Sequence, residues 1–210
     1  NDTIFAGRGD NSIDGKGGSN TLRYDLGSAA SAAITVDLSI TTAQATGGSG
    51  LDTLLNFIHL VGSGFDDTLS GNAGANNING GNGNDVINGR EGNDTLTGGA
   101  GQDVFAFSAP LGATNSDTIT DFSLADDTIR LDAGAIAVVG PGLVNGVLSA
   151  AFFVANATGT AMDGDDYFAY NIVNGQLRYD ADGNGGTHTA VLIAVIGTSV
   201  RPLLTSDDIL

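Results

Sequence analysis

Residues 62–106 read GSGFDDTLS, GNAGANNIN, GGNGNDVIN, GREGNDTLT and GGAGQDVFA, which are five consecutive units of nine residues. Glycine fills most of the first four places of these units. The sixth place always holds Asp or Asn, at Asp67, Asn76, Asp85, Asp94 and Asp103. The eighth place always holds a large apolar residue, at Leu69, Ile78, Ile87, Leu96 and Phe105. A disordered polar linker has no reason to keep this apolar period, so the stretch predicts a folded repeat.

Each unit predicts a loop followed by a very short strand. Glycine tolerates positive φ angles and close backbone approach, whereas Val, Ile, Thr and Phe suit a pleated strand. One unit is then half a turn, and two units complete a coil. Loops on one side stack about 4.8 Å apart, as neighbouring strands do. We therefore expect one ladder of Asp67, Asp85 and Asp103, and a second ladder of Asn76 and Asp94.

Stacked carboxylates at this spacing repel each other unless a cation lies between them. Calcium accepts roughly six to eight oxygen ligands in flexible geometry, and each pair of loops offers carboxylates and glycine carbonyls. The absence of cysteine and of clustered histidine argues against zinc or copper. The pattern predicts several calcium ions (Ca²⁺). The candidate ligand residues are Asp52, Gly62, Gly64, Asp67, Gly71, Gly74, Asn76, Gly80, Gly81, Gly83, Asp85, Gly89, Gly92, Asp94, Gly98, Gly99, Gly101, Asp103, Asp117 and Asp121.

The repeats resemble the RTX, or haemolysin-type, calcium-binding repeats of secreted bacterial proteins. Together with SDTITDF, YDADGNGG and the terminal LTSDDIL, they resemble the C-terminal region of serralysin-like metalloproteases. The resemblance implies a parallel β-roll and an extracellular protein of Gram-negative type. It also implies a C-terminal signal for the type I secretion machinery, with export C-terminal end first and folding outside on calcium. Loops that bring carboxylates together need a metal to close, which couples binding to folding.

The predicted fold is all-β, with a parallel β-roll over residues 1–132 and a β-rich cap with the secretion signal over 133–210. Weaker units run through Asn1–Arg23, and residues 24–46 are expected to leave the coil. Within that excursion, a strand is predicted over Ile34–Ile40, with 42–46 pairing back against it. The period resumes with GGSGLDTLL at 47–55, followed by six residues, NFIHLV. If those six form a shortened half turn, Asp52 stacks below Asp67.

Two acidic segments leave alternatives open. Asp117 and Asp121 either close the last calcium loop or satisfy backbone amides in turns. DADGNGG at 180–186 places Asp180, Asp182 and Asn184 like the start of an EF-hand loop, but Val191 stands where a bidentate Glu is required. This segment is therefore either a calcium site or an acidic turn. Asn174-Gly175 predicts a β-hairpin, and 135–139 is a candidate strand or short helix. His59 is expected to be an exposed or hydrogen-bonded histidine rather than a ligand.

Composition limits the function classes. The formal net charge is -17, and Glu91 is the single Glu among 24 acidic residues. Because Asp is typical of turns and loops, we expect most of the acidic residues to lie in loops. Nucleic acid and anionic membrane surfaces would repel such a chain. No apolar run is long enough for membrane insertion, and we expect no signal peptide in the first residues of this sequence. Since the first residues, NDTIF, are the second half of a unit, we expect the chain to begin inside a longer protein.

The sequence indicates no enzyme within the chain. The zinc motif H-E-x-x-H is absent, and two histidines, His59 and His188, cannot supply a three-histidine site. No nucleophile and base with supporting groups can be named; a catalytic domain such as a metalloprotease would lie upstream. The expected function is a non-catalytic calcium-dependent folding and secretion module. The alternative is a polysaccharide-binding tail, or a surface-layer or adhesin module that self-associates through calcium.

Overall fold

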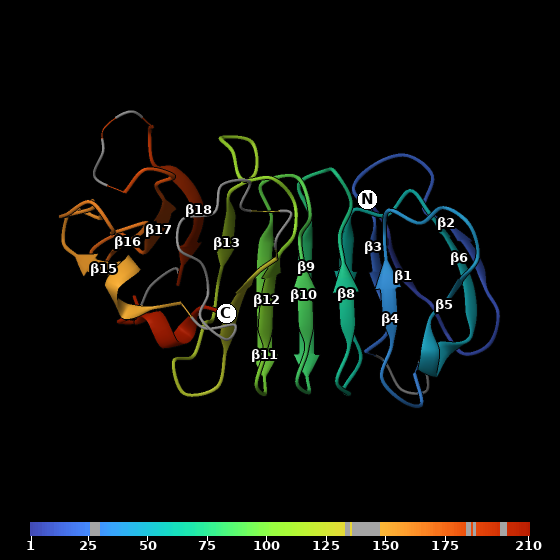
Figure 1. The fold of residues 1–210 in the computed structure, drawn as a ribbon. Coiled ribbons are helices and arrows are strands. Elements are labelled where there is room, and N and C mark those ends of the chain that lie inside the picture. Colours follow the sequence, from blue (N-terminus) through green and yellow to red (C-terminus); the bar gives the residue numbers. More distant parts are fainter. Residues whose placement is uncertain (26–29, 133–134, 136–147, 184–185, 187, 198–200) are drawn as a thin grey trace.

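The computed structural model describes residues 1–25, 30–132, 135, 148–183, 186, 188–197 and 201–210. In these ranges the regular elements are short strands and three single-turn 3₁₀ helices, η1 (Gly47–Ser49), η2 (Ala150–Phe152) and η3 (Ser206–Asp208), with no α-helix. None of these helices has the length and apolar character to cross a bilayer. The strands stand side by side along one axis of the molecule (Figure 1). The predicted all-β fold is confirmed.

Two parallel sheets build the roll and enclose one hydrophobic core. The first sheet has the order β1 (Thr3–Phe5), β3 (Thr21–Arg23), β7 (His59–Val61), β9 (Asn77–Asn82), β11 (Thr95–Ala100) and β13 (Asp117–Ile119). The second has the order β14 (Thr128–Leu131), β12 (Val104–Phe107), β10 (Val86–Asn88), β8 (Thr68–Ser70) and β4 (Thr35–Asp37). The chain alternates between the sheets from β7 to β14, which confirms the predicted parallel β-roll.

The register follows the repeat. Leu96 pairs with Ile78 in the first sheet, and Ile87 pairs with Leu69 in the second. All eighth-place residues of the five units are 0% exposed, as are Ile119 and Ile129 in the two strands that follow. Burial of one such side chain contributes about 1.5–3 kcal/mol. The column of apolar side chains between the sheets is therefore the main source of packing energy in the roll.

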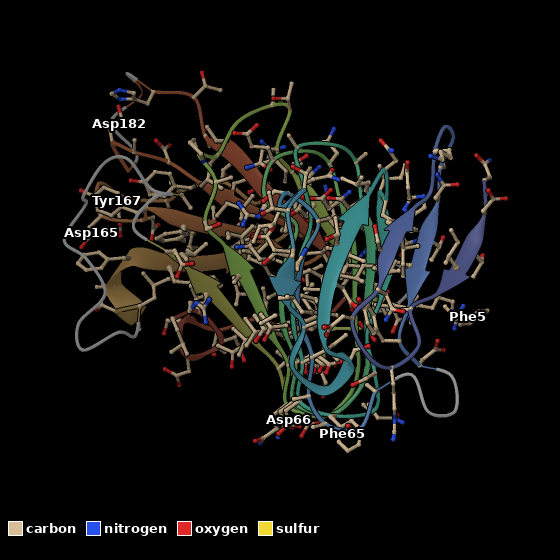
Figure 2. The ribbon with its side chains drawn as sticks, turned by 90° about the vertical axis from the view of Figure 1, so that its right-hand side faces the viewer. Phe5, Phe65, Asp66, Asp165, Tyr167 and Asp182 are labelled. Atoms are coloured by element: carbon tan, nitrogen blue, oxygen red, sulfur yellow. The ribbon has the colours of Figure 1, made fainter. Side chains whose placement is uncertain are left out.

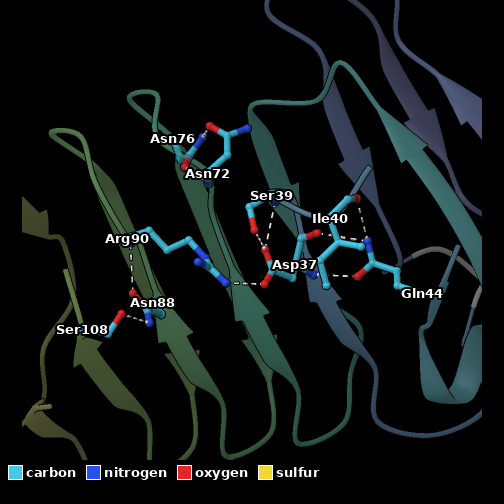
Figure 3. Close-up of polar contacts among 9 residues, drawn as sticks. All are labelled: Asp37, Ser39, Ile40, Gln44, Asn72, Asn76, Asn88, Arg90 and Ser108. Atoms are coloured by element: carbon cyan, nitrogen blue, oxygen red, sulfur yellow. Dashed lines mark hydrogen bonds and ion pairs between the residues drawn. The ribbon is translucent and has the colours of Figure 1, made fainter. Parts of the chain in front are cut away.

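The segment predicted to leave the coil contributes one strand to it. β4 lies parallel to β8, with Val36 opposite Leu69, and Val36 is buried. The predicted strand through Ile40 is wrong, because β4 ends at Asp37 and the Gln44 side chain holds the turn that follows. Gln44 accepts a hydrogen bond from the Asp37 amide and donates to the Asp37 and Ile40 carbonyls (Figure 3).

The same turn is tied to the roll two strands away. Arg90, at the second place of its loop with φ of 70°, forms an ion pair with Asp37 across β8 (Figure 3). Residues 42–46 do not pair with β4. β5 (Gln44–Ala45) pairs antiparallel with β6 (Leu51–Leu55) instead. The excursion is thus held to the roll at Asp37 and to β6 at Gln44–Ala45.

A third sheet at the N-terminal end has the order β2 (Ser12–Asp14), β6 and β5. β6 pairs with β2 in register Ser12 to Thr53, which places Asp52 opposite Asn11. The predicted stacking of Asp52 below Asp67 is therefore wrong. The loop at 62–67 follows a strand of the first sheet, whereas the loop at 47–52 leads into the third sheet. His59, on β7, accepts a hydrogen bond from the Asn77 amide at 3.1 Å, as expected of a structural histidine.

The C-terminal region continues the first sheet beyond β13. β18 (Val191–Ile196) pairs parallel with β13, and β17 (Gln176–Tyr179), β16 (Phe168–Asn171) and β15 (Phe153–Asn156) follow outward. β16 and β17 are antiparallel, which confirms the hairpin predicted from Asn174-Gly175. The predicted element at 135–139 lies outside the described residues except for Ala135.

The last two residues close the edge of the second sheet. Leu131 donates its amide to the Leu210 carbonyl, and Leu210 donates its amide to the Ile129 carbonyl, both at 2.8 Å. Ile209, between these contacts, is 0% exposed. A solenoid needs such a cover over its last strand, because an open edge would expose unpaired backbone groups and core side chains.

Candidate metal centre

Two stacks of loops connect the two sheets. The first stack runs from the first sheet to the second and carries the sixth-place residues Asp67, Asp85, Asp103 and, after β13, Asp127. The second stack runs in the opposite direction and carries Asn76, Asp94 and Asp117. All seven side chains are buried at 7% exposure or less. By contrast, Asp66 and Phe65 lie at the outer tip of their loop, in solvent (Figure 2).

One carboxylate oxygen of each ladder residue accepts a hydrogen bond from the coil before it. The Asp67 amide donates to Asp85 Oδ1 at 2.8 Å, and the Asp85 amide donates to Asp103 Oδ1 at 2.9 Å, each across 18 residues. The same bond joins the Asp103 amide to Asp127 Oδ1, the Asn76 amide to Asp94 Oδ1 and the Asp94 amide to Asp117 Oδ1. These bonds fix the inward direction of each carboxylate.

The other oxygen has no hydrogen-bond partner in the middle of the ladders. Among the described residues, Asp85 Oδ2, Asp94 Oδ2 and Asp103 Oδ2 are buried side-chain oxygens without a partner. An unpartnered buried carboxylate oxygen is costly, since the group has lost water and gained no donor. A bound cation would therefore stabilise the folded chain most at these three oxygens.

Backbone carbonyls approach the carboxylates of Asp85 and Asp67. A methyl carbon added to Gly80 would meet Asp85 Oδ2 of its own loop and, at 2.6 Å, the Gly98 carbonyl oxygen of the next coil. At Gly62 the corresponding oxygens belong to Asp67 and Gly80. Two oxygens with no proton between them repel, and hard oxygen donors of this kind suit calcium. Along the described chain, no three His, Cys, Asp or Glu side chains form a metal cluster. Carbonyls would have to complete each site.

The ends of the ladders are satisfied differently. Asp67 Oδ2 accepts from the Ser63 amide, and Asp127 Oδ2 accepts from the Ser123 amide at 2.8 Å. Asn76, a neutral amide, accepts from the Asn72 amide and donates to the Ile58 carbonyl. The ladder carboxylates with a buried oxygen that has no hydrogen-bond partner are therefore those of Asp85, Asp94 and Asp103.

Burial makes the ladder carboxyls weak acids when no metal is bound. It raises the pKa of Asp85 to about 7 and that of Asp117 to about 8, and neighbouring carboxylates add to both effects. Burial also raises the pKa of Asp94 and of Asp127 to about 6, and it raises the pKa values of Asp67 and Asp103. The ladders hold negative charge poorly unless a cation balances it.

The predicted glycines fall into four places of the loops. Gly62, Gly71, Gly80, Gly89 and Gly98 hold the first place, Gly81 and Gly99 the second, Gly64 the third, and Gly74, Gly83, Gly92 and Gly101 the fourth. Gly99 shows why the second place needs glycine. Its φ is 106°, and an added methyl carbon would collide with the Gly81 carbonyl. Gly64 is different, since nothing lies within 4 Å of such a carbon.

Asp117 and Asp121 play different parts. Asp117 extends the second ladder by accepting the Asp94 amide at 3.0 Å. Asp121 accepts the amides of Gly98 at 3.0 Å and Gly99 at 2.9 Å, which is the backbone-satisfying alternative. The ladder position of Asp127 was missed from sequence. Its signal is the tripeptide Asp-Thr-Ile, which repeats the Asp-Thr-Leu of Asp67–Leu69.

Asp52 is fully occupied by protein donors. Its Oδ1 accepts from the Asn11 amide at 2.9 Å and the Asn11 side chain at 3.2 Å. Its Oδ2 accepts from the Tyr24 hydroxyl at 3.1 Å and the Thr46 hydroxyl at 2.9 Å. Burial raises the pKa of Tyr24, which keeps its phenol protonated and able to donate. Asp52 is therefore a structural hydrogen-bond acceptor, and the prediction that it is a ladder ligand is wrong.

Comparison with known proteins agrees with this geometry. The family model of the RTX calcium-binding nonapeptide repeat, four copies long, matches residues 1–28, 59–87 and 80–107. A search of curated proteins found no match to the chain. The matched segments include the loops that hold Asp67, Asp85 and Asp103. RTX repeats of this kind bind several calcium ions per repeat region. The chain therefore carries an RTX, or haemolysin-type, calcium-binding repeat region.

Proposed function

We propose that the chain is a calcium-dependent folding module of a secreted protein, with no catalytic role of its own. The observation that carries the proposal is the set of unpartnered, buried oxygens on Asp85, Asp94 and Asp103. Calcium, when bound, supplies the positive charge that these loops lack. Asp85 and Asp103 of the first stack and Asp94 of the second are the proposed carboxylate ligands. Glycine carbonyls of the adjoining loops complete the proposed sites.

The chain's own residues explain why folding would wait for calcium. The register of the sheets brings Asp85 between Asp67 and Asp103, and the amide bonds hold each carboxylate inward. Forming the coil without a cation therefore costs either charge repulsion or protonation. Where calcium is scarce the chain would stay unfolded, and where it is abundant binding would drive folding.

The second part of the proposal is export by a type I secretion system to the extracellular space, as part of a larger exoprotein. It is supported by the resemblance of the repeats and of LTSDDIL to the tails of exported RTX proteins. The burial of Ile209 in the folded chain also supports it, because the terminal segment would be accessible to a transporter before folding and covered afterwards. Export of the full chain from a Gram-negative host, with and without residues 204–210, tests this part.

The decisive experiment for folding is a calcium titration of chelator-treated protein followed by far-ultraviolet circular dichroism, with magnesium as the control. We expect a cooperative rise of β signal with calcium alone. Magnesium demands a tighter octahedral geometry and gives up its water reluctantly, so it should not replace calcium. A protein that is fully folded in chelator and indifferent to calcium would overturn the proposal.

A further inference from the structure

A groove separate from the metal ladders lies on the outer face of the β16–β17 hairpin. This hairpin stands at the end of the molecule that carries β15 to β18 (Figure 1). Its volume is about 430 Å³. Asn171, Gln176 and Arg178 form its floor, while Leu177 and Tyr179 face the core. The loop at 158–161 and the segment 189–190 form its walls.

The floor of the groove presents hydrogen-bond donors. Asn171 Oδ1 accepts from the amides of Val173 at 2.9 Å and Asn174 at 3.0 Å. Asn174 Oδ1 accepts from the Gln176 amide at 3.0 Å, and Gln176 Oε1 accepts from Arg178 Nη2 at 3.0 Å. The carbonyl end of each side-chain amide is therefore engaged, and its NH₂ end remains as a donor. Asn171 is only 7% exposed, so its direction is fixed by packing.

Arg178 adds a positive charge. The chain has only seven Lys and Arg residues at a net charge of -17, and Lys16, Arg23, Arg90 and Arg130 each pair with an aspartate. Arg178 forms no such ion pair within the described residues. Its Nη2 contacts Gln176 and its Nη1 the Ala190 carbonyl at 3.5 Å, which leaves further N–H groups of the fork for a ligand.

Hydrogen bonds of the Asn156 side chain also hold the wall of the groove in one conformation. Asn156 Oδ1 accepts from the Thr158 and Gly159 amides, and Asn156 Nδ2 donates to the Thr160 carbonyl at 2.8 Å. This holds the Thr158 and Thr160 hydroxyls at the rim, 2.8 Å apart. Asp180 lies at the other end of the floor and offers acceptor oxygens. A ligand that fits all these groups needs one anionic group, several oxygen acceptors and at least one hydroxyl donor.

We propose that this groove binds a small hydroxylated carboxylate, which is the chemistry of a sugar acid. The carboxylate would lie against Arg178, where a planar guanidinium makes paired bonds to a planar anion. The NH₂ groups of Asn171, Asn174 and Gln176 would donate to hydroxyl or ring oxygens. Asp180 would accept from a hydroxyl and would repel a second negative charge, which disfavours compact dianions such as sulfate. The site shares no residue with the calcium ladders.

The test uses the calcium-saturated full chain and nuclear magnetic resonance of its side-chain amide and arginine N–H signals. D-Galacturonate should cause saturable shifts of the Asn171, Asn174 and Gln176 signals, while neutral D-galactose and sulfate should bind at least about tenfold more weakly. The α-1,4-linked galacturonate trimer distinguishes the source of the ligand. Tighter binding than the monomer assigns a polymer, and equal binding assigns a free sugar acid.

Two variants check the assignment. Arg178→Met should weaken galacturonate binding at least about tenfold, whereas the matched Arg130→Met, outside the groove, should leave it unchanged. Asn174→Asp keeps the acceptor of the exposed turn and adds a repelling charge, so it should weaken binding in a folded protein. Absence of saturable shifts with galacturonate, equal binding of galactose, or unchanged binding in Arg178→Met and Asn174→Asp would overturn the proposal. None of these results would affect the calcium titration, so the two proposals fail separately.

Discussion

Ile34 donates its backbone amide to Asp67 Oδ1 at 2.8 Å, so an apolar residue occupies the ladder position directly before Asp67. The carboxylate series of the first stack therefore begins at Asp67, and Ile34, at the ladder position of the coil before it, has no acidic side chain to share a cation. Together with the Ser63 amide on Asp67 Oδ2, this restricts the need for calcium to the coils that follow.

Asp85→Asn should weaken calcium binding and reduce its cooperativity. The substitution removes a charge that lies between Asp67 and Asp103, and loss of one charged contact of about 1.5–3 kcal/mol corresponds to roughly a tenfold or larger change in affinity. Isothermal titration calorimetry gives the affinity and the Hill slope. The matched control is Asp66→Asn, because Asp66 is exposed in the same loop and its Oδ1 needs only to accept the Asn84 amide. Equal titration curves for the two variants would contradict the ladder assignment.

Gly99→Ala should destabilise the calcium-loaded protein by about 1–3 kcal/mol. Its φ of 106° is strained for alanine, and the added methyl group would collide with the Gly81 carbonyl. Urea unfolding in excess calcium measures the loss. Gly64→Ala is the control, since the space beside Gly64 is open, and it should change stability little.

Lower pH should partly replace calcium. The unfolded pKa of Asp is about 3.9, and the folded values of Asp85 and Asp117 are about 7 and about 8. Because the folded values are raised, the contribution of these carboxyls to the stability of the calcium-free fold is fully present below about pH 3.9 and is lost as pH rises through about 7 to 8. Calcium affinity should follow the opposite course, since the ligands must be ionised.

Circular dichroism of chelated protein between about pH 4 and pH 8 checks this dependence. Asp117→Asn should flatten the profile, whereas Asp207→Asn, on the surface, should leave its shape unchanged. A calcium-free protein that gains β signal as the pH rises would be inconsistent with buried, neutral ladder carboxyls.

Tyr24→Phe should lower the free energy of unfolding by about 1.5–3 kcal/mol, the usual worth of a hydrogen bond to a charged group. The phenol is 2% exposed and donates to Asp52 Oδ2. Thermal and urea unfolding in saturating calcium measure the change. The number of calcium ions bound should stay the same, because Asp52 belongs to a hydrogen-bond network. A lower calcium stoichiometry would restore Asp52 as a ligand.

Ile209→Ala should lower the free energy of unfolding by about 2–5 kcal/mol, as expected for a fully buried aliphatic side chain. The loss would open the cover over β14, so hydrogen exchange should increase first at Thr128–Leu131. Leu203→Ala provides the comparison, because Leu203 is 66% exposed in the same terminal segment. Similar effects of the two substitutions would show that the terminal residues do not cap the roll.

The regular part of the fold could be predicted from sequence because period and packing coincide there. The apolar residue at each eighth place and the polar residue at each sixth place specify both the strand and the inward carboxylate. Prediction failed where loops differ in length. Ile34 is 33 residues before Asp67, and Asp127 is 24 residues after Asp103, instead of 18. A fixed period cannot detect such coils.

The position of Asp52 in the fold could not be predicted from the sequence either. GGSGLDTLL matches the repeat in every place, yet the partner strand of β6 is β2 rather than β8. Pairing partners depend on the path of the intervening chain, which nine-residue patterns do not encode. The donor-rich groove was not predicted either, because it depends on which face of β16 and β17 is outward and on a wall supplied by residues 158–161.

The unequal loops of the roll also separate two quantities that a strictly periodic chain would link, the length of the polypeptide and the phase of its coils. Extra residues between β4 and β8 or between β12 and β13 extend the chain without rotating any later strand. One residue deleted inside a strand would instead turn its inward side chains outward. The loops are therefore the positions at which such a protein can gain or lose residues during evolution. Its short strands must keep their length, because an insertion or deletion there would expose core side chains.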